Sequence, residues 1–430
     1  MRKINLNITI NASREQVWKA ITGAEYYNHW TKVFTSTSFF KGGWNTGDTI
    51  RFLAYNKEGN VDGMVSEIAE SNYPSFISIK HLGYIYHGVD DTTSDEIKSW
   101  APAYENYTLT SLSDEETIFS LDMDVTDDYY DMFMDLWPKA MSALKTTAEN
   151  IKPQSIYPCL WFHTEAHEAA DFYIKVFHQS RLLERNGFVS TFELSGSKFM
   201  AMNGGPTYSV NPAVSYYVYC GHVAEIERMY NLLSESGHQI MPLGKYAWSE
   251  KYAWVMDKYG VNWQLDIDYI NHSQKIVPTL LFANHKKNDV KSAIQYYTSI
   301  FAPSTILVEA PFAPEADMPA ESLLFAQFKI NGVVFNAMSN IMPSEDDFTP
   351  GNSFVVECNN QDEIDHFWEQ LGHEGRYDRC GWLADKFGVS WQVIPDYLSK
   401  LVADPEKGPI AIQAFMKMQK FELDLLPRLG

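Results

Sequence analysis

Two short segments, far apart in the chain, carry the side chains best suited to binding a small molecule. They read KYGVNWQLDI, ending at Ile267, and KFGVSWQVIP, ending at Pro395. Each places an indole beside a primary amide, as Trp263–Gln264 and Trp391–Gln392. An indole stacks on planar groups, and an amide both donates and accepts hydrogen bonds. This chemistry favours holding a planar or apolar guest over transferring protons.

The other reactive side chains indicate structural roles. Cys159 and Cys220 lie in segments that read as buried strands, where a thiol is usually inert, and no GxSxG motif occurs. The pair Asp127–Asp128 begins a predicted helix, where carboxylates act as caps. Asp257 and Asp385 precede the turn into the last strand of each segment and are expected to shape that turn. No catalytic nucleophile is predicted, so the catalytic residues are unknown and enzymatic activity is left open.

The two segments close two copies of a longer pattern. Each copy starts with an apolar strand, YPCLWF or VPTLLF, followed by a helix with aromatic residues on one face. More strands, a second helix and the Trp-Gln strand follow, and seven of the closing 16 residues are identical between the copies. The sequence therefore contains a tandem repeat, placed at residues 151–272 and 273–430, with two βαβββ halves in each copy.

The repeat resembles the PhnB-like branch of the vicinal oxygen chelate (glyoxalase/bleomycin-resistance) superfamily, long labelled as demethylubiquinone methyltransferase-like. PCLWF, FMAMNGGP and GWLADKFGVSWQ carry the resemblance, over about residues 155–400. It implies a curved sheet whose concave face holds a ligand and often a divalent metal, with one such site expected in each copy. The methyltransferase label has no support in the residues, because no glycine-rich turn follows a first parallel strand with an acidic residue further on.

The strand pattern and the resemblance together predict residues on the two concave faces. The first copy offers Trp161, Met202, Asn203, Tyr217, Trp263 and Gln264, and the second offers Leu281, Met338, Val355, Trp391 and Gln392. Such a lining suits a small aromatic or apolar ligand held in orientation by amides. The alternative, in which Trp and Gln only pack the sheet, stays open.

Metal ligands are missing where the resemblance implies them. Relatives place a His on the first strand and a Glu on the last strand of the site. Counting along this chain puts Pro158 and Pro278 at the first position, and Gln264 and Gln392 at the second. Proline cannot ligate a metal, and a neutral amide is a weak donor. We therefore expect no metal and no cofactor in either copy.

Residues 1–150 follow a different pattern. INLNITI alternates as a half-buried strand does, Ser13 and Gln16 fit a helix capping box, and hairpins are expected from about Thr49 to Val125. A long amphipathic helix should follow from Thr126, with a kink or a delayed start caused by Pro138.

This order resembles the START-like (SRPBCC) family, in the branch similar to the heat-shock-chaperone ATPase activator domain. The resemblance implies a sheet that grips a long helix around a cavity, often for an apolar ligand. Aromatic residues that could line it are Trp30, Phe39, Phe52, Tyr55, His81, Tyr84, Tyr86 and Tyr107. Among them Tyr55, His81 and Tyr107 are the candidate ligand-binding residues. The alternative is that these side chains simply fill a core.

Composition narrows the possible partners. A formal charge of −21 with no basic run repels nucleic acid and anionic membranes. Four scattered cysteines, an N-terminus unlike a signal peptide, and no long apolar stretch favour a reduced, cytoplasmic protein. After Asp404, an amphipathic helix is expected to dock on the last domain through Met416, Met418 and Phe421.

The prediction is an α+β protein with a helix-grip START-like domain (1–150) and two vicinal oxygen chelate domains (151–272, and 273–430 with a helical tail). The favoured function is metal-free binding of small apolar or aromatic ligands. The alternatives are a vicinal oxygen chelate enzyme acting on a small carbonyl or aromatic substrate, and a chaperone-associated interaction protein. Elemental analysis separates the first two, and stimulation of a chaperone ATPase would favour the third. A monomer satisfies the fold, and a homodimer is possible.

Overall fold

The structure is a computed structural model, which describes residues 1–113, 115–151, 155–268, 274–313, 318–319 and 321–427. The chain forms two compact units, unit 1 (Met1–Pro153) and unit 2 (Gln154–Asp268 with Gln274–Gly430). Both mix helices with sheets, which confirms the α+β class. Within the described ranges, no helix has both the length and the apolar character needed to cross a membrane.

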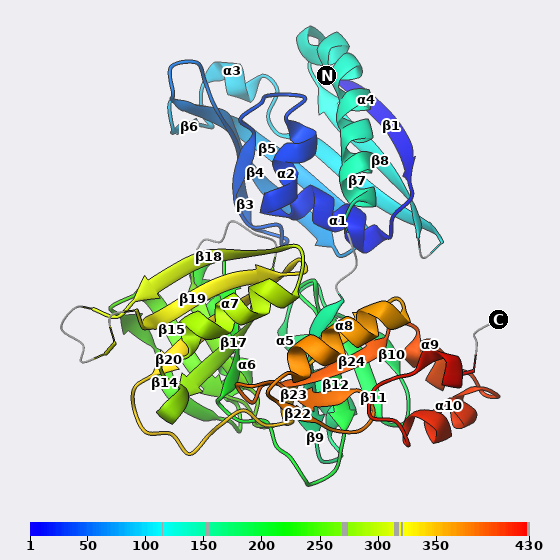
Figure 1. The fold of residues 1–430 in the computed structure, drawn as a ribbon. Helices are drawn as coiled ribbons and strands as arrows, with labels where there is room; N and C mark the ends of the chain where they lie inside the picture. The colour runs from blue at the N-terminus through cyan, green and yellow to red at the C-terminus, as the bar shows by residue number, and fades with distance from the viewer. Residues whose placement is uncertain (114, 152–154, 269–273, 314–317, 320, 428–430) are drawn as a thin grey trace. The chain divides into compact units, whose positions relative to one another are not determined.

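Unit 1 is an antiparallel sheet with one long helix packed against it (Figure 1). The strand order is β1-β8-β7-β5-β4-β3-β2, with β6 paired to β5. The elements are β1 (Arg2–Ile10), α1 (Arg14–Thr22), α2 (Ala24–Thr31), β2 (Phe39–Gly42), β3 (Thr49–Tyr55), β4 (Val61–Asn72), β5 (Phe76–Tyr86), β6 (Val89–Asp91), α3 (Asp95–Lys98), β7 (Ala103–Ser113), β8 (Glu116–Val125) and α4 (Asp127–Glu149).

Local sequence explains the helices of unit 1. The predicted capping box is present, because Ser13 Oγ accepts a hydrogen bond from the Gln16 amide at 3.3 Å and Gln16 Oε1 accepts one from the Ser13 amide at 2.9 Å. Helix α4 packs on β1, α1 and α2 and continues through Pro138. The predicted delayed start of this helix is therefore wrong, since α4 begins at Asp127.

Unit 2 contains both copies of the repeat and the tail. The first copy forms β9 (Ile156–Phe162), α5 (Ala166–Val176), β10 (Arg181–Arg185), β11 (Val189–Leu194), β12 (Ser197–Asn203), β13 (Val214–Cys220), α6 (Val223–Ser234), β14 (His238–Tyr246), β15 (Ser249–Met256) and β16 (Asn262–Ile267). The second forms β17 (Ile276–Ala283), the 3-10 helix η1 (Asn284–Lys286), α7 (Val290–Ile300), β18 (Ser304–Pro311), β19 (Leu323–Ile330), β20 (Val333–Asn340), β21 (Asn352–Cys358), α8 (Gln361–Gly372), β22 (Arg376–Tyr377), β23 (Trp382–Ala384) and β24 (Ser390–Pro395).

The two copies exchange halves. One sheet has the order β10-β11-β12-β9-β21-β24-β23-β22, and the other has the order β14-β15-β16-β13-β17-β20-β19-β18. Each sheet thus joins the first half of one copy to the second half of the other, through the antiparallel pairs β9–β21 and β13–β17. The expectation of one concave site within each copy is wrong, because residues 204–213 and 341–351 carry the chain from one sheet to the other.

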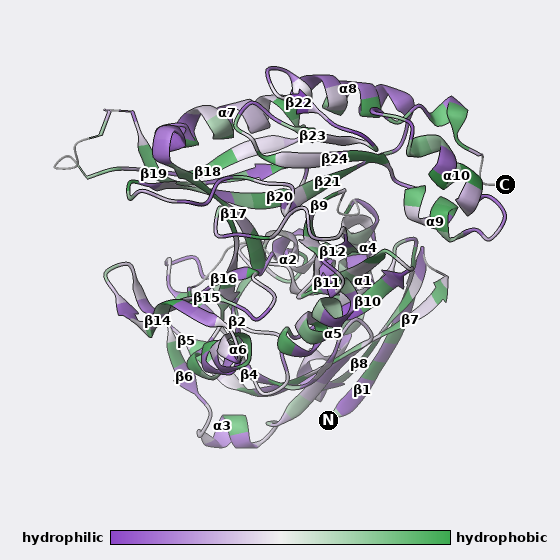
Figure 2. Ribbon diagram, turned by 90° about the horizontal axis from the view of Figure 1, so that it is seen from below, coloured by the Kyte–Doolittle hydropathy of each residue, from purple (hydrophilic) through white to green (hydrophobic). Residues whose placement is uncertain are grey.

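The predicted tail helix is replaced by shorter pieces. Helices α9 (Leu398–Ala403) and α10 (Gly408–Phe415) are followed by the 3-10 helix η2 (Leu423–Leu425). Between α10 and η2 the chain is held by backbone hydrogen bonds, from the Cys380 amide to Met418 O at 2.9 Å and from the Gly381 amide to Gln419 O at 2.7 Å. Figure 2 shows α9 and α10 beside the end of β24. Docking on the last domain is confirmed for Met418 and Phe421, although not as one helix, whereas Met416 is 54% exposed.

Candidate functional site

One face of the sheet β10-β11-β12-β9-β21-β24-β23-β22, called cup 1, holds a cavity of about 710 Å³. Strands of both copies and the tail line it. Its lining includes Tyr157, Trp161, Met200, Met202, Trp382 and Ile394 from the strands, and Leu398, Val402, Ile412, Phe415 and Phe421 from the tail. A cavity of this size with mostly apolar walls is typical of a small-molecule site.

Four predicted residues, Trp161, Met202, Asn203 and Gln392, line this cavity. Two of them are also held by the backbone. Trp161 Nε1 donates to Gly205 O at 2.8 Å, and Asn203 Oδ1 accepts from the Ala166 amide, at the start of α5, at 2.9 Å. These bonds fix the orientation of the indole and the amide before any ligand arrives, which reduces the entropic cost of binding.

Glycine at 204 allows Trp161 to lie flat against the end of β12. A β-carbon built on Gly204 would lie 2.1 Å from an indole carbon of Trp161, closer than real side-chain contacts allow. The glycine of the FMAMNGGP stretch therefore makes room for the Trp161 ring, and the distance of 2.1 Å shows why a side chain is excluded there.

Trp263 and Trp391 were predicted to touch ligand, and this prediction is wrong. Their exposed fractions are 0% and 1%, and their rings pack against Phe177 of the first copy and Phe301 of the second, at centroid distances of 4.8 Å and 5.6 Å. Adjacent residues on a strand face opposite sides of the sheet, so Trp and Gln cannot both face the concave side. The indoles face the helices, and the amides face the cups.

Each of these indoles is anchored by the aspartate of its DK(Y/F)G turn. Asp385 Oδ2 accepts from Trp391 Nε1 at 2.9 Å and from the Tyr297 hydroxyl at 2.8 Å. Its Oδ1 accepts from the amides of Phe387 and Val389. Burial raises the pKa of Asp385 to about 6. Asp257 likewise accepts from the Trp263 indole and from the amides of Tyr259 and Val261, and burial raises its pKa to about 6, so a role in shaping the turn is confirmed for both aspartates.

The corresponding face of the other sheet, called cup 2, carries the predicted residues Tyr217, Gln264 and Met338. Gln264 Nε2 lies 3.8 Å from Met338 Sδ and donates to Ser215 Oγ at 2.7 Å. Gln264 Oε1 accepts from the Tyr252 hydroxyl at 2.6 Å, and Tyr217 donates to Asp266. Burial raises the pKa of both tyrosines, so their hydroxyls remain protonated donors.

Comparison of the two cups explains why cup 1 contains a cavity. Three tyrosines of cup 2 occupy positions whose counterparts in the repeat have smaller or charged side chains. Tyr217, Tyr219 and Tyr252 correspond to Val355, Glu357 and Cys380. Tyr219 and Tyr252 are only 8% and 3% exposed, which shows that their rings fill space inside unit 2. The repeat itself contains this signal, since Tyr252 and Cys380 occupy equivalent positions in KYAWVMDKYG and RCGWLADKFG.

Cup 1 also contains a charged group that the sequence analysis missed. Glu357 Oε1 accepts from Lys198 Nζ at 2.8 Å and from the Tyr157 hydroxyl at 2.7 Å. The Lys198 ammonium also lies 4.1 Å from the centre of the Tyr157 ring. Burial, followed by the nearby Glu357 carboxylate, raises the pKa of Tyr157 well above its usual value. Strands β9, β12 and β21 each supply one member, so the group forms only when the two copies combine.

Pro158, which the residue count placed at a metal-ligand position, does not face cup 1. Pro158 is the register partner of Phe354, whose ring packs on Trp391 on the helix side of the sheet. Cys159 lies between Tyr157 and Trp161 and shares their side. Burial raises the pKa of its thiol to about 11, which keeps it protonated at neutral pH. Among the described residues, no three His, Cys, Asp or Glu side chains converge as metal ligands would.

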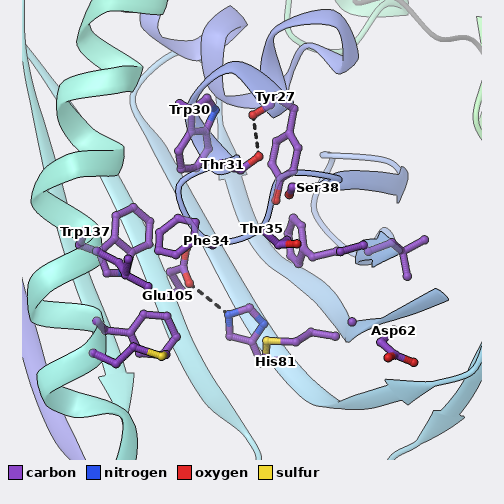
Figure 3. A pocket seen from close by; sticks show the side chains of 18 of the residues that line it. Tyr27, Trp30, Thr31, Phe34, Thr35, Ser38, Asp62, His81, Glu105 and Trp137 are labelled. Carbon is purple, nitrogen blue, oxygen red and sulfur yellow. Dashed lines mark hydrogen bonds and ion pairs between the residues drawn. The ribbon is translucent and has the colours of Figure 1, made fainter. Parts of the chain in front are cut away.

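Unit 1 contains a second cavity, of about 320 Å³ (Figure 3). Of the predicted residues, His81 and Tyr107 line it, whereas Tyr55 is 53% exposed, outside the lining, and stacks on Phe39. The prediction for Tyr55 is therefore wrong. Strand β3 ends at Tyr55, so its ring lies at the edge of the sheet.

The polar wall of the unit 1 cavity is a hydrogen-bonded chain. Glu105 accepts from the Tyr107 hydroxyl and lies 3.4 Å from His81 Nε2, while His81 Nδ1 lies 2.8 Å from Ser66 Oγ. Burial raises the pKa of Tyr107 well above its usual range. Trp137 also lines the cavity, and its buried Nε1 has no hydrogen-bond partner among the described residues. Sequence reasoning missed both Glu105 and Trp137.

Comparison with known proteins identifies unit 2. A family model described as 3-demethylubiquinone-9 3-methyltransferase matches residues 154–266 and 274–394, which is more than half of the chain. Among solved structures, a putative 3-demethylubiquinone-9 3-methyltransferase, PhnB protein, from Bacillus cereus is 35% identical over 27% of this chain and 100% of its own, with a TM-score of 0.26. A Pseudomonas aeruginosa protein is 22% identical over 26% of this chain and 94% of its own, with a TM-score of 0.23.

Another solved structure, the Aha1 dimer from Colwellia psychrerythraea, is 19% identical over 36% of this chain and 100% of its own, with a TM-score of 0.26. No curated protein matches the chain. The family match covers both copies of the repeat separately. The chain therefore belongs to the 3-demethylubiquinone-9 3-methyltransferase family and carries two PhnB-like domains of the glyoxalase/bleomycin-resistance type in tandem.

Proposed function

We propose that this protein binds a small, mainly apolar aromatic molecule in cup 1, without a metal. The observation that carries the proposal is the 710 Å³ cavity. It is lined by two indoles, three methionines and the amide of Gln392, and it lies where the other cup has three tyrosines. Indoles and thioethers give a planar guest dispersion and edge contacts, and one amide is enough to orient it.

The side chains of the cup support binding rather than acyl transfer or metal chemistry. Cys159, the thiol on the cup side of β9, is buried and has a raised pKa, which is the opposite of an activated nucleophile. Lys198 and Glu357 neutralise each other at 2.8 Å. An uncharged guest avoids the cost of burying a net charge beside this pair. We therefore favour a neutral ligand.

The unit 1 cavity is proposed as a second, separate binding site. Its support is the buried Trp137 Nε1, a donor with no partner within the described residues, in the lining of this cavity. A buried donor without an acceptor costs roughly 1–3 kcal/mol, and a ligand carbonyl or ether oxygen would remove that cost. The Glu105 carboxylate lines the same wall and offers an acceptor to a ligand donor.

Naphthalene titration of the full chain tests the proposal for cup 1. Ten carbon atoms at about 0.6 kcal/mol each predict a dissociation constant on the order of 50 µM. Trp161 and Trp382 line the cavity, so their fluorescence should change on binding, and the change should shrink in Trp161→Phe. Trp248→Phe is the matched control, because Trp248 is 62% exposed and lies outside the lining.

The outcome that contradicts the proposal is a fluorescence change that never saturates, or one equally large in Trp161→Phe. Elemental analysis of the purified protein provides the metal test. Stoichiometric zinc, nickel, manganese or iron would refute the metal-free part of the proposal while leaving the cavity as a binding site.

A further inference from the structure

The tyrosine-filled cup 2 shows how a phenol is bound at this position of the fold. The Tyr252 hydroxyl donates to Gln264 Oε1 at 2.6 Å, and Gln264 Nε2 donates to Ser215 Oγ at 2.7 Å. The phenol ring is almost fully buried. Ser215, Gln264 and Tyr252 lie on three neighbouring strands, β13, β16 and β15, so the sheet itself determines the geometry of this chain of hydrogen bonds.

Cup 1 retains the amide and the serine but lacks the phenol. Gln392 Nε2 donates to Ser353 Oγ at 2.9 Å, as its counterpart does in cup 2. The residue equivalent to Tyr252 is Cys380, and the backbone there still follows β24, since Gly381 O accepts from the Val393 amide at 2.8 Å. No hydroxyl takes the place of Tyr252 in the described hydrogen bonds of Gln392; the neighbouring side chain hydrogen-bonded to this amide is the thiol of Cys159, a weak donor.

The place of the missing ring belongs to the cavity. Cys380 and Gln392 both line it, together with Met202, whose counterpart Met338 lies against the amide in cup 2. Cysteine in place of tyrosine lacks the ring and the hydroxyl that in cup 2 donates to the amide carbonyl. A carbonyl of this kind gains most from a ligand that brings its own donor.

We propose that the ligand of cup 1 is a phenol whose hydroxyl donates to Gln392 Oε1, with its ring in the place that Tyr252 fills in cup 2. This inference rests on the proposed binding function of cup 1 and specifies its chemistry. The substituent para to the hydroxyl would take the position of the Cβ of Tyr252. It would point toward Cys380 and the part of the cavity wall that the tail forms. Para-substituted phenols are therefore the expected class.

The test compares para-cresol with toluene, which has the same ring and methyl group but no hydroxyl. In the wild-type chain, calorimetric titration should give about tenfold tighter binding of para-cresol, the value expected for one buried hydrogen bond. Gln392→Leu should remove this preference while toluene still binds. Equal affinity for both probes in the wild type would overturn the phenol inference and leave the proposed function intact, whereas binding of neither probe would overturn the proposed function itself.

A second variant keeps the inference testable if Gln392→Leu does not fold. Tyr252→Ala opens in cup 2 the space that Cys380 leaves in cup 1, with Gln264 and Ser215 still present. The number of para-cresol molecules bound per chain should rise by one, with the same preference over toluene at the new site. An additional site without that preference would show that the amide does not select a hydroxyl, and the inference would fail.

Discussion

Replacing Asp385 with asparagine should lower the opening free energy of β24 by about 3 kcal/mol. Four donors converge on this carboxylate, two backbone amides, the Trp391 indole and the Tyr297 hydroxyl. An asparagine keeps one acceptor oxygen but replaces the other with an NH₂ group, which then faces groups that also donate. The Trp391 N–H is only a donor, so it cannot accept a hydrogen bond from that NH₂ group. Hydrogen exchange of the β24 amides in the intact chain measures the loss.

Two matched variants control this prediction. Asp257→Asn removes the same acceptor from Trp263 and from the amides of Tyr259 and Val261, so a similar loss is expected in β16. Asp424→Asn, at an exposed position of η2, should change stability by less than about 0.5 kcal/mol. A loss below about 1 kcal/mol for Asp385→Asn would show that the carboxylate does not anchor Trp391.

The stabilisation that Asp385 contributes should decrease as the pH rises. Burial raises the pKa of Asp385 to about 6, above the unfolded value of about 3.9. Because the pKa is raised in the folded state, the contribution of Asp385 to the free energy of unfolding is fully present below about pH 4 and is lost as the pH rises through 6. Asparagine does not titrate, so the gap between the wild type and Asp385→Asn should be larger at pH 5 than at pH 7.5.

Phe421→Ala should detach the tail from cup 1. Phe421 is 1% exposed, packs on Phe415 at a centroid distance of 5.6 Å and lines the cavity. Removing a buried phenylalanine costs about 3–5 kcal/mol, more than the two backbone hydrogen bonds at Cys380 and Gly381 can recover. We expect faster tryptic cleavage in the tail and at least a tenfold loss of naphthalene affinity, because one wall of the cavity is gone.

Leu425→Ala is the control for the tail, since Leu425 is in η2 but 65% exposed. It should leave both proteolysis and naphthalene binding unchanged. If Phe421→Ala keeps full affinity with a cleaved tail, the tail is not a wall of the binding site. If it keeps both affinity and protease resistance, the docking of Phe421 contributes little.

Much of the fold could be predicted because its signals are local. The capping box at Ser13, the alternation of β8 and the repeat around the two Trp-Gln strands each depend on residues close together in the chain. The exchange of halves could not be predicted in this way. Strand pairing within a copy or between copies buries the same faces, so hydrophobic periodicity is identical for both arrangements.

Only part of the candidate site could be predicted from the sequence. Trp161, Met202, Asn203 and Gln392 were found from strand position, but Trp263 and Trp391 are one residue from the amides and so face the opposite side. Lys198 and Glu357 meet only across the exchanged halves, and no sequence spacing indicates that contact. The substitution of Tyr252 by Cys380 was visible in the repeat, yet its meaning depends on knowing that both face a cup.

The most direct test of the account is a crystal of the full chain soaked in 1-bromonaphthalene and measured at the bromine absorption edge. Bromine carries its own anomalous signal, so its position does not depend on interpreting weak density. The account predicts one bromine peak in cup 1, between Trp161, Met202 and Phe415, and none in cup 2. Bromine in cup 2 or only on the molecular surface, with cup 1 empty, would contradict it.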